Sequence, residues 1–304
     1  MNKQKIVITG ALGYVGLELT SLFFNNFDFS VIAIDNRRDL FLEKIFKENK
    51  INYFNREIFN IKDLINNADV IYHLASITNV PKTQQEETEE LERQIMKIGV
   101  DGTRYILENC KKTCKVIFAS THVVFEGLVD NLNFIDEIRK PKPILSYSRS
   151  KFISENDIIN SGINFIISRF ASVYGYNYSI RKDIVANFFA LKASRSEEIK
   201  LFSGGLNIKP LIGVSDLSRV LYMFSNDIYL NDIYHLVNEN VTVKTIANIC
   251  KKYNENVNLT VSNDIISNVG YSLSNKKLLS IGFRFKQDLD TEIKLIMEKF
   301  IGFN

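Results

Sequence analysis

Short apolar runs alternate with amphipathic segments over the first 170 residues. The runs predict strands at 4–9, 30–35, 51–54, 69–73, 115–119 and 164–169, and helical patterns lie near 13–25, 38–48, 60–67, 86–112 and 147–160. Such alternation is typical of a parallel sheet with helices on both faces. The strands are continuous apolar runs, such as Val116 to Phe118, which indicates that both faces of the sheet are covered.

The first predicted strand runs directly into a glycine-rich turn. Thr9 is followed by Gly10, Gly13 and Gly16, and an apolar-periodic helix continues to Phe24. A strand, a tight glycine turn and a helix N-terminus form a phosphate site, because free backbone N–H groups and the helix dipole point at the anion. Gly10 permits the sharp turn, Gly13 allows the pyrophosphate to approach the backbone, and Gly16 allows close helix packing. The turn therefore predicts a dinucleotide site.

An aspartate ends the second predicted strand. Asp35 lies 19 residues after Gly16, where a dinucleotide-binding fold places a carboxylate that hydrogen-bonds the adenosine ribose. This carboxylate would repel a 2′-phosphate, so it favours NAD as the cofactor. Arg37 and Arg38 follow closely and could accept such a phosphate instead, which keeps NADP as the alternative.

The regular alternation of predicted strands and helices ends after residue 174. A turn-rich junction precedes a helix near 182–195, a strand near 200–202, and helices near 242–252 and 287–300. We expect an α/β protein with a Rossmann-type, doubly wound parallel sheet and a smaller mixed α/β substrate lobe. The NAD-binding domain is predicted at 1–173 with about 211–253, and the substrate-binding lobe at about 174–210 and 254–304.

Composition narrows the classes of function. The chain has 304 residues, 45% of them hydrophobic, and a formal net charge of +3, which gives no argument for binding nucleic acid or a membrane surface. No apolar run approaches the roughly 20 residues that span a bilayer, and no signal-peptide pattern precedes the first strand. Three cysteines and three histidines show no metal-ligand spacing. We expect a soluble, cytoplasmic protein without a metal.

Tyr147 and Lys151 are separated by four residues in a predicted helix, so they share one face. A free tyrosine has a pKa of about 10, too high for a base at neutral pH. A neighbouring ammonium group and the positive nicotinamide would stabilise the phenolate, and lowering its pKa by about 3 units takes about 4 kcal/mol. The phenol could then exchange a proton with a sugar hydroxyl while hydride moves to or from the nicotinamide.

A hydroxyl partner is expected at the end of the strand predicted at 115–119. Ser120, Thr121 and His122 follow this strand, and ligands bind at the carboxyl ends of strands in open α/β sheets. A hydroxyl at this edge could hydrogen-bond the reacting oxygen and hold its geometry. Thr121 and Ser120 are both candidates, and His122 is either a second proton-transfer group or a turn residue.

Together these motifs resemble the extended short-chain dehydrogenase/reductase family, in its NAD-dependent nucleotide-sugar epimerase/dehydratase branch. The resemblance covers essentially the whole chain. It rests on Thr9-Gly10-x-x-Gly13-x-x-Gly16, His73 to Ser76, Phe118 to Thr121, Tyr147-x-x-x-Lys151, Arg169 to Gly175, Gly213 to Asp216 and Ser274 to Leu278.

The resemblance implies a role for each matching residue. Tyr147 would be the acid/base, Lys151 its activator and a ribose ligand, and Thr121 the hydroxyl partner. The cofactor would be bound by Gly10, Leu12, Gly13, Tyr14, Val15, Asp35, Asn36, Glu57, Ile58, Leu74, Ala75, Ser76, Tyr147, Lys151, Ser172 and Val173. The substrate would be bound by Thr78, Thr121, His122, Tyr147, Arg181 and Lys209.

The chain departs from the family pattern at three positions. Gly99 replaces a usual asparagine, which affects either an active-site hydrogen bond or a backbone kink. His122-Val123 replace the Asp-Glu pair of sugar 4,6-dehydratases, which argues against elimination of water, and the decarboxylase branch also has a glutamate there. Lys209 takes the place of the usual arginine and, with Arg181, is a candidate ligand for the substrate's diphosphate.

The resemblance implies hydride transfer at a ring carbon of a nucleotide-diphosphate sugar, most often C4. We expect an epimerase, with a 4-dehydrogenase or 4-ketoreductase as the alternative and a non-catalytic NAD-binding sensor as the remote one. Relatives form homodimers through a four-helix interface, and the helices near 86–112 and 147–160 would supply it here.

Overall fold

The computed structural model describes residues 3–77, 84–130, 132–226, 228–262 and 270–301. Its contacts divide the chain into two compact units. The first unit comprises Met1–Gly127, Pro141–Arg169 and Ser218–Tyr234, and the second comprises Leu128–Lys140, Phe170–Leu217 and His235–Asn304.

These bounds differ from the predicted domains at residues 128–140, 170–173, 211–217 and 235–253, which all belong to the second unit. The reason for the last of these segments is apolar packing. Its helix α9 (Val243–Tyr253) buries Ile246, Ala247 and Cys250 in the core of the second unit.

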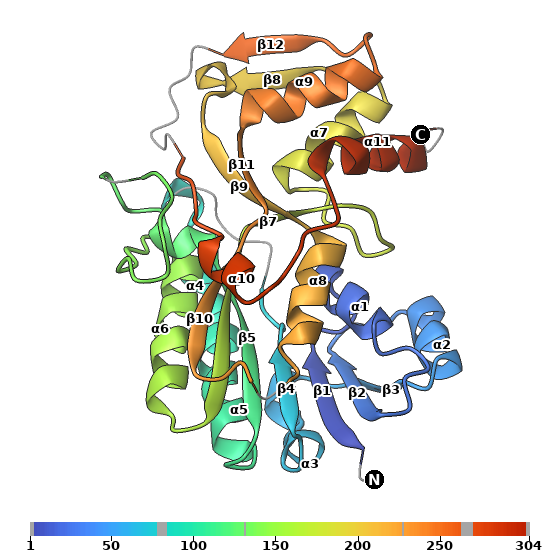
Figure 1. Ribbon diagram of the computed structural model, residues 1–304, viewed down its shortest axis with the longest axis vertical. Coiled ribbons are helices and arrows are strands. Elements are labelled where there is room, and N and C mark those ends of the chain that lie inside the picture. The colour runs from blue at the N-terminus through green and yellow to red at the C-terminus, as the bar shows by residue number, and fades with distance from the viewer. Residues whose placement is uncertain (1–2, 78–83, 131, 227, 263–269, 302–304) are drawn as a thin grey trace. The chain divides into compact units, whose positions relative to one another are not determined.

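A seven-stranded sheet forms the centre of the first unit (Figure 1). Its strands are β1 (Gln4–Thr9), β2 (Phe29–Asp35), β3 (Asn52–Asn55), β4 (Val70–His73), β5 (Lys115–Thr121), β6 (Asn164–Phe170) and β10 (Asp232–Leu236), in the order β10-β6-β5-β4-β1-β2-β3. Successive pairs from β3 to β5 are parallel. The direction of winding reverses between β1 and β4, so the carboxyl ends of these two strands border the crevice where such sheets bind ligands.

Helices cover both faces of this sheet. They are α1 (Tyr14–Ser21), α2 (Leu40–Glu48), α3 (Lys62–Ile65), α4 (Glu89–Met96), α5 (Gly102–Asn109), α6 (Ser146–Asn160) and α8 (Val214–Met223). On one face Val7 and Val116 pack in a cluster with Ile106 of α5. On the other, the Phe23 ring lies 6.2 Å from that of Tyr72 and 4.9 Å from that of Tyr222 in α8. The predicted Rossmann-type α/β fold is confirmed.

The helix predicted over 86–112 is interrupted. Between α4 and α5 the backbone forms a π-helical turn at Lys97–Asp101, labelled η3. The Gly99 carbonyl within this turn accepts hydrogen bonds from Thr103 Oγ1 at 2.6 Å and Ser154 Oγ at 3.0 Å. A Cβ at Gly99 would lie 3.0 Å from Ser150 Oγ. The backbone at Gly99 is therefore π-helical instead of regular α-helix, and the glycine fits closely against Ser150 of α6.

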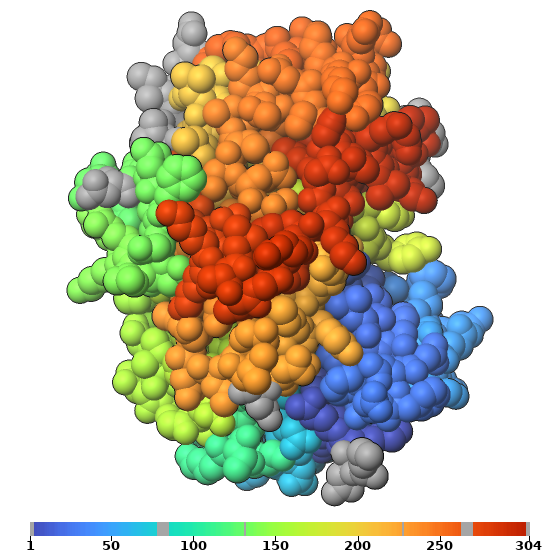
Figure 2. All heavy atoms as spheres, viewed as in Figure 1, coloured from blue at the N-terminus to red at the C-terminus, as the bar shows by residue number. Residues whose placement is uncertain are grey.

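The second unit contains two small sheets. β7 (Ser172–Tyr174), β9 (Ile208–Gly213) and β11 (Glu239–Thr242) form one sheet, and β8 (Ile199–Phe202) pairs in parallel with β12 (Leu259–Ser262). The remaining helices are α7 (Val185–Ser194), α10 (Lys276–Ser280) and α11 (Leu289–Phe300). Phe189, Ile246 and Ile293 bring α7, α9 and α11 into one apolar core. The outer sides of α9 (orange) and α11 (red) form much of the visible face of this unit (Figure 2). Among the residues that the structure describes, every helix is too short or too polar to span a bilayer.

We predict that Lys115→Met destabilises the first unit. Lys115 is 2% exposed, and its Nζ donates to the carbonyl oxygens of Ser225 at 2.8 Å and Asn226 at 2.7 Å. Removing the donor leaves the two carbonyls, which follow the end of α8, without this partner, at a cost of about 1–3 kcal/mol in the free energy of unfolding. Urea denaturation measures the loss. Lys112→Met, at an exposed position three residues earlier, should stay within about 0.5 kcal/mol, and equal effects of the two variants would contradict the assignment.

Candidate functional site

The turn after β1 is fixed by close backbone contacts. Gly10 adopts a φ of +70°, and a Cβ there would lie 2.9 Å from the backbone nitrogen of Ala75. A Cβ at Gly16 would lie 2.1 Å from the Gly10 carbonyl oxygen. Neither position can accept a side chain without moving the backbone.

The turn delivers the chain into α1 with Gly13 as the residue before the helix. Gly13 offers no side-chain cap, and no acidic residue lies in the first turn, which begins at Tyr14 and Val15. The dipole of a helix favours an anion at its N-terminus. This end of α1 therefore fits the phosphates of a dinucleotide, as the sequence predicts.

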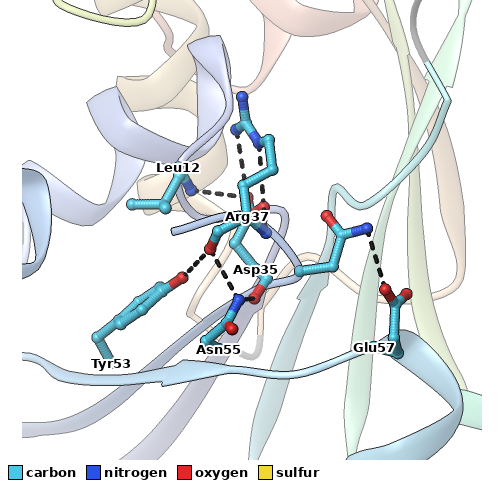
Figure 3. Close-up of polar contacts among 7 residues, drawn as sticks. Leu12, Asp35, Arg37, Tyr53, Asn55 and Glu57 are labelled. Carbon is cyan, nitrogen blue, oxygen red and sulfur yellow. Dashed lines mark hydrogen bonds and ion pairs between the residues drawn. The ribbon is translucent and has the colours of Figure 1, made fainter. Parts of the chain in front are cut away.

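Asp35 ties the end of β2 to the glycine turn (Figure 3). Its carboxylate is 6% exposed, and Oδ2 accepts the Leu12 N–H at 3.0 Å. Oδ1 accepts the backbone N–H and the Nε–H of Arg37, at 3.0 and 3.1 Å. The predicted ribose ligand is thus held rigidly beside the turn, and the Arg37 guanidinium lies against it.

Side chains of β3 and of the segment that follows it stabilise the end of β2, at one corner of the sheet (Figure 3). Tyr53 Oη donates to the Arg37 carbonyl, and Asn55 Nδ2 donates to the carbonyls of Arg37 and Asp35. Burial and the nearby Asp35 carboxylate raise the pKa of Tyr53 to about 12, so its hydroxyl stays protonated. Asn36 and Glu57 are joined by a 3.4 Å hydrogen bond.

The predicted adenosine ligands therefore gather at one corner of the sheet. Ile58 differs from the others because it is 7% exposed and belongs to the apolar core of the first unit. Arg38, the second arginine considered for a 2′-phosphate, is paired with Glu43 at 3.3 Å.

A buried histidine fixes the loop after β4. His73 is 1% exposed; its Nδ1 lies 3.1 Å from Thr9 Oγ1 and its Nε2 lies 3.1 Å from Thr103 Oγ1. The Ala75 N–H donates to Thr9 Oγ1 at 3.2 Å. These contacts link the ends of β1 and β4 to the start of α5, and they position Leu74, Ala75 and Ser76, which are half-buried. Burial, with a smaller contribution from Lys151, lowers the pKa of His73 to about 3, so the ring is neutral.

Tyr147 and Lys151 lie one turn apart on α6. Lys151 Nζ is 5.8 Å from the centroid of the Tyr147 ring and 4.8 Å from that of Phe118. It donates to the Ala119 carbonyl at 2.7 Å. Burial lowers the pKa of Lys151 to about 7, against an opposing contribution from Glu155. The spacing on which the predicted dyad rests is therefore present in the fold.

The two hydroxyls that end β5 have different partners. Ser120 is 3% exposed, and its Oγ donates to Glu155 Oε1 at 2.5 Å. Thr121 Oγ1 accepts the Val123 N–H at 3.3 Å at the start of the short 3-10 turn η4 (His122–Phe125). Successive residues of a strand point to opposite faces. Thr121 thus remains the candidate for contact with a substrate, whereas the Ser120 hydroxyl is bound to the buried Glu155. His122 is 8% exposed in the same turn.

The carboxylate that follows this turn stabilises the start of α6. Glu126 Oε1 accepts the N–H groups of Ile144 and Leu145 at 2.9 and 2.7 Å, and it also accepts the Ser148 hydroxyl. This glutamate therefore serves as a helix-end anchor. Within the described residues, no group of three or more His, Cys, Asp or Glu side chains could hold a metal ion.

The second unit contains a cavity of about 420 Å³ with aromatic and cationic walls. The Lys192 ammonium lies 5.5 Å from the centroid of the Phe188 ring, and that of Lys200 lies 5.0 Å from Phe202. The lining residues are Val185, Phe188, Phe189, Lys192, Lys200, Phe202, Asn207, Lys209 and Val243. Burial lowers the pKa of Lys209. Flat rings beside ammonium groups suit a base attached to phosphates.

Among the predicted site residues of the second unit, only Lys209 lines this cavity. Arg181 pairs with Asp183 and is not among the residues that line the cavity. Ser172 and Val173 form part of β7. Their expected place beside the cofactor stays a prediction. Thr78 lies outside the described residues.

Comparison with known proteins identifies relatives that match most of this chain. The family model described as the RmlD substrate binding domain matches residues 4–263. A dTDP-D-glucose 4,6-dehydratase of Dictyostelium discoideum is 27% identical over 258 residues, which are 77% of this chain and 58% of that protein. The UDP-glucuronic acid decarboxylase 1 of Danio rerio is 24% identical over 74% of this chain and 54% of that protein. Each match thus spans less than two thirds of the relative's length.

Solved structures share the fold along its full length. The UDP-glucose 4-epimerase of Thermotoga maritima, crystallised with UDP-glucose, has a TM-score of 0.81 and 21% identity, and the match covers 98% of each chain. The UDP-glucuronic acid 4-epimerase of Bacillus cereus, in complex with UDP-glucuronic acid and NAD, has a TM-score of 0.81 and 18% identity, covering 98% of this chain and 99% of that one.

Some functional candidates escaped the sequence analysis. Phe188 lies on α7, and Lys200 and Phe202 lie on β8. The sequence predicted both elements, near 182–195 and 200–202, but not that these side chains line a cavity. The ion pair of Glu155 with Arg169 also went unnoticed, although Glu155 lies four residues after Lys151. This four-residue spacing could have indicated that Glu155 shares a face of the helix with Lys151.

The buried His73 predicts a specific dependence of stability on pH. Its folded pKa lies below the unfolded value of 6.5, so the unfolded state binds the extra proton between these values. Stability is then fully present above about pH 6.5 and falls as the pH decreases towards 3. The loss by pH 5, relative to pH 7.5, is about 2 kcal/mol. Urea denaturation at both pH values should show that His73→Gln lacks this component, and identical pH profiles for the two proteins would refute it.

Proposed function

Because the chain belongs to the RmlD substrate binding domain family, within the extended short-chain dehydrogenases/reductases that its motifs resemble, we propose that it is an NAD-dependent enzyme acting on a nucleotide-diphosphate sugar. One observation carries the proposal. Tyr147 and Lys151 share a face of α6, and Lys151 Nζ reaches the Ala119 carbonyl near the carboxyl end of β5. The unit that holds this dyad also holds the glycine turn and Asp35.

Three side chains of the first unit carry the proton chemistry in this proposal. Tyr147 exchanges the proton of the sugar hydroxyl, because a phenol with a lowered pKa can act as both base and acid near neutral pH. Lys151 supplies the positive charge that stabilises the phenolate. Thr121 holds the reacting oxygen by a hydrogen bond. NAD, when bound, supplies the acceptor and donor of hydride.

The geometry of the β2 end supports NAD in preference to NADP. The carboxylate of Asp35 faces the glycine turn, and both arginines that could receive a 2′-phosphate are paired with carboxylates. A ribose with a free 2′-hydroxyl could donate to Asp35, whereas a phosphate would be repelled by it. The B. cereus epimerase structure, which shares the fold, contains NAD.

The cavity of the second unit supports a nucleotide as the carrier of the sugar. Phe188 and Phe202 are 41% and 40% exposed, so their rings can stack with a base. Lys192, Lys200 and Lys209 provide cationic partners for a diphosphate. The T. maritima relative was crystallised with UDP-glucose.

We infer further that hydride transfer occurs at C4 and that the enzyme is an epimerase. A reaction that eliminates water needs an additional acid and base near the substrate. His122 and Val123 occupy those positions, and the nearby Glu126 anchors α6. A 4-keto sugar that stays bound can be reduced again on its other face, which inverts C4 without net redox change. Release of the keto sugar with reduced cofactor would instead identify a dehydrogenase. A homodimer formed through α4, α5 and α6 also stays a proposal from the resemblance.

The Tyr147→Phe variant tests the catalytic assignment. Loss of the phenolic hydroxyl should lower kcat for interconversion of a nucleotide-sugar pair by about 10²–10⁴-fold, because general acid–base catalysis contributes this much. Product formation is followed by chromatography with a panel of UDP- and dTDP-sugars. Tyr178→Phe, at a position 72% exposed, is the matched control and should keep wild-type kcat. Absence of activity towards every nucleotide sugar in the wild-type enzyme would reject the proposal.

Substitution in the cavity tests the place of the nucleotide. Phe202→Ala should raise KM for the nucleotide sugar by about 5–150-fold, since stacking of one base on a ring contributes about 1–3 kcal/mol. Because the reacting sugar is remote from the base, kcat should change by less than about threefold. Phe27→Ala removes a ring that is 64% exposed in the first unit and serves as the control. An unchanged KM would place the base elsewhere.

A further inference from the structure

A buried ion pair begins one helical turn after Lys151 on α6. Glu155 of α6 and Arg169 of β6 have side chains that are 1% and 3% exposed. Arg169 Nε donates to Glu155 Oε1 at 3.0 Å, and its second nitrogen donates to Oε2 at 2.7 Å. A buried pair of charges costs much desolvation energy and is weak evidence for stability by itself. Its presence here therefore calls for a specific explanation.

The pair is connected to Lys151 through two neighbouring residues of β5. The Ala119 carbonyl accepts from Lys151 Nζ at 2.7 Å, and the Ser120 hydroxyl donates to Glu155 at 2.5 Å. Tyr147, Lys151 and Glu155 follow one another at four-residue intervals, which places them along one face of α6. Strand β5 thus holds the ammonium group and the carboxylate in a fixed relation to each other.

Each charged or titratable group near Lys151 acts differently on its proton. Burial favours the neutral amine, and Glu155 is the group that opposes this effect. His73 of β4 is neutral and adds no charge. The centroid of the Tyr147 ring lies 5.8 Å from Lys151 Nζ. Arg169 of β6 directs its charge at Glu155, and its guanidinium also lies 5.2 Å from the Phe125 ring.

We propose that Glu155, held by Arg169 and Ser120, is a positioning residue that retains the proton on Lys151 and thereby sets the charge beside Tyr147. The link to catalysis rests on the proposed function, whereas the effect on the Lys151 proton does not depend on it. Without the carboxylate, Lys151 loses its proton at a lower pH. The Tyr147 phenolate then loses its neighbouring cation, and its pKa rises.

The proton on Lys151 can be measured directly in the full-length protein. Protein labelled with ¹³C at lysine Cε is titrated by NMR, and the Lys151 signal is identified by its absence from Lys151→Met. Glu155→Gln should lower the midpoint of this signal by at least one pH unit, a tenfold change in the proton dissociation constant. Asp157→Asn is the matched control, because it removes a carboxylate of α6 that pairs with Arg104 at 2.8 Å. It should leave the midpoint within 0.3 units, a bound that is about a twofold change in affinity.

Leaving Arg169 buried without Glu155 could prevent folding, so a second variant is needed. Glu155→Gln combined with Arg169→Met removes both charges, and it should still lower the Lys151 midpoint, although by less than the single variant. An unchanged or higher midpoint in whichever of the two variants folds would overturn the proposal.

The pH profile of kcat/KM gives the catalytic readout. In Glu155→Gln its acidic limb should move to higher pH and its alkaline limb to lower pH, whereas a purely structural defect would lower the profile without shifting either limb. If the wild-type protein proves inactive with all nucleotide sugars, the proposed function fails, but the NMR titration still decides the role of Glu155.

Discussion

The carbonyl oxygen of Gly10 lies so close to the first turn of α1 that a Cβ at Gly16 would approach it to 2.1 Å. This contact fixes the angle at which α1 leaves β1, and the site depends on that angle. The turn reaches the carboxylate of Asp35 through the Leu12 N–H on one side. On the other side, the Gly10 backbone lies against Ala75, which Thr9 and His73 hold in place. The ends of β1, β2 and β4 are thereby joined.

Around Lys151, the proposed site is held together by buried charged side chains and not by close backbone contacts. Lys151, Glu155 and Arg169 are all at most 3% exposed, and each has a hydrogen-bond partner on a neighbouring element. In a medium of low dielectric constant, such charges act strongly on one another and on a nearby phenol. Burying these charges costs desolvation energy. We propose that they are retained because they keep the proton on Lys151. The neutral His73 fits this picture, because a second cation there would compete with Lys151.

Local pattern predicted most of the fold and the spacing of Tyr147 and Lys151 on α6. The strands and the glycine turn could be predicted because their signals are periodicity and spacing within the chain. The placement of Tyr147 and Lys151 followed from one helical turn. Strand β5, however, extends to Thr121 rather than 119, and only this extension separates the roles of Ser120 and Thr121. The Glu155–Arg169 pair depends on how α6 lies against β6, and the cavity near Phe202 depends on the packing of α7 beside β8 and β9. Such long-range relations have no signature in a single segment.

Identification of the bound dinucleotide tests the central claim most directly. The purified protein is denatured, and any released nucleotide is identified by mass spectrometry; the folded protein is also titrated with NAD and NADP by calorimetry. The account predicts that NAD or NADH is released, or that added NAD binds at one site per chain and more tightly than NADP, with Gly16→Val abolishing this binding. Release of NADP, preferential binding of NADP, or no binding of either dinucleotide would contradict it.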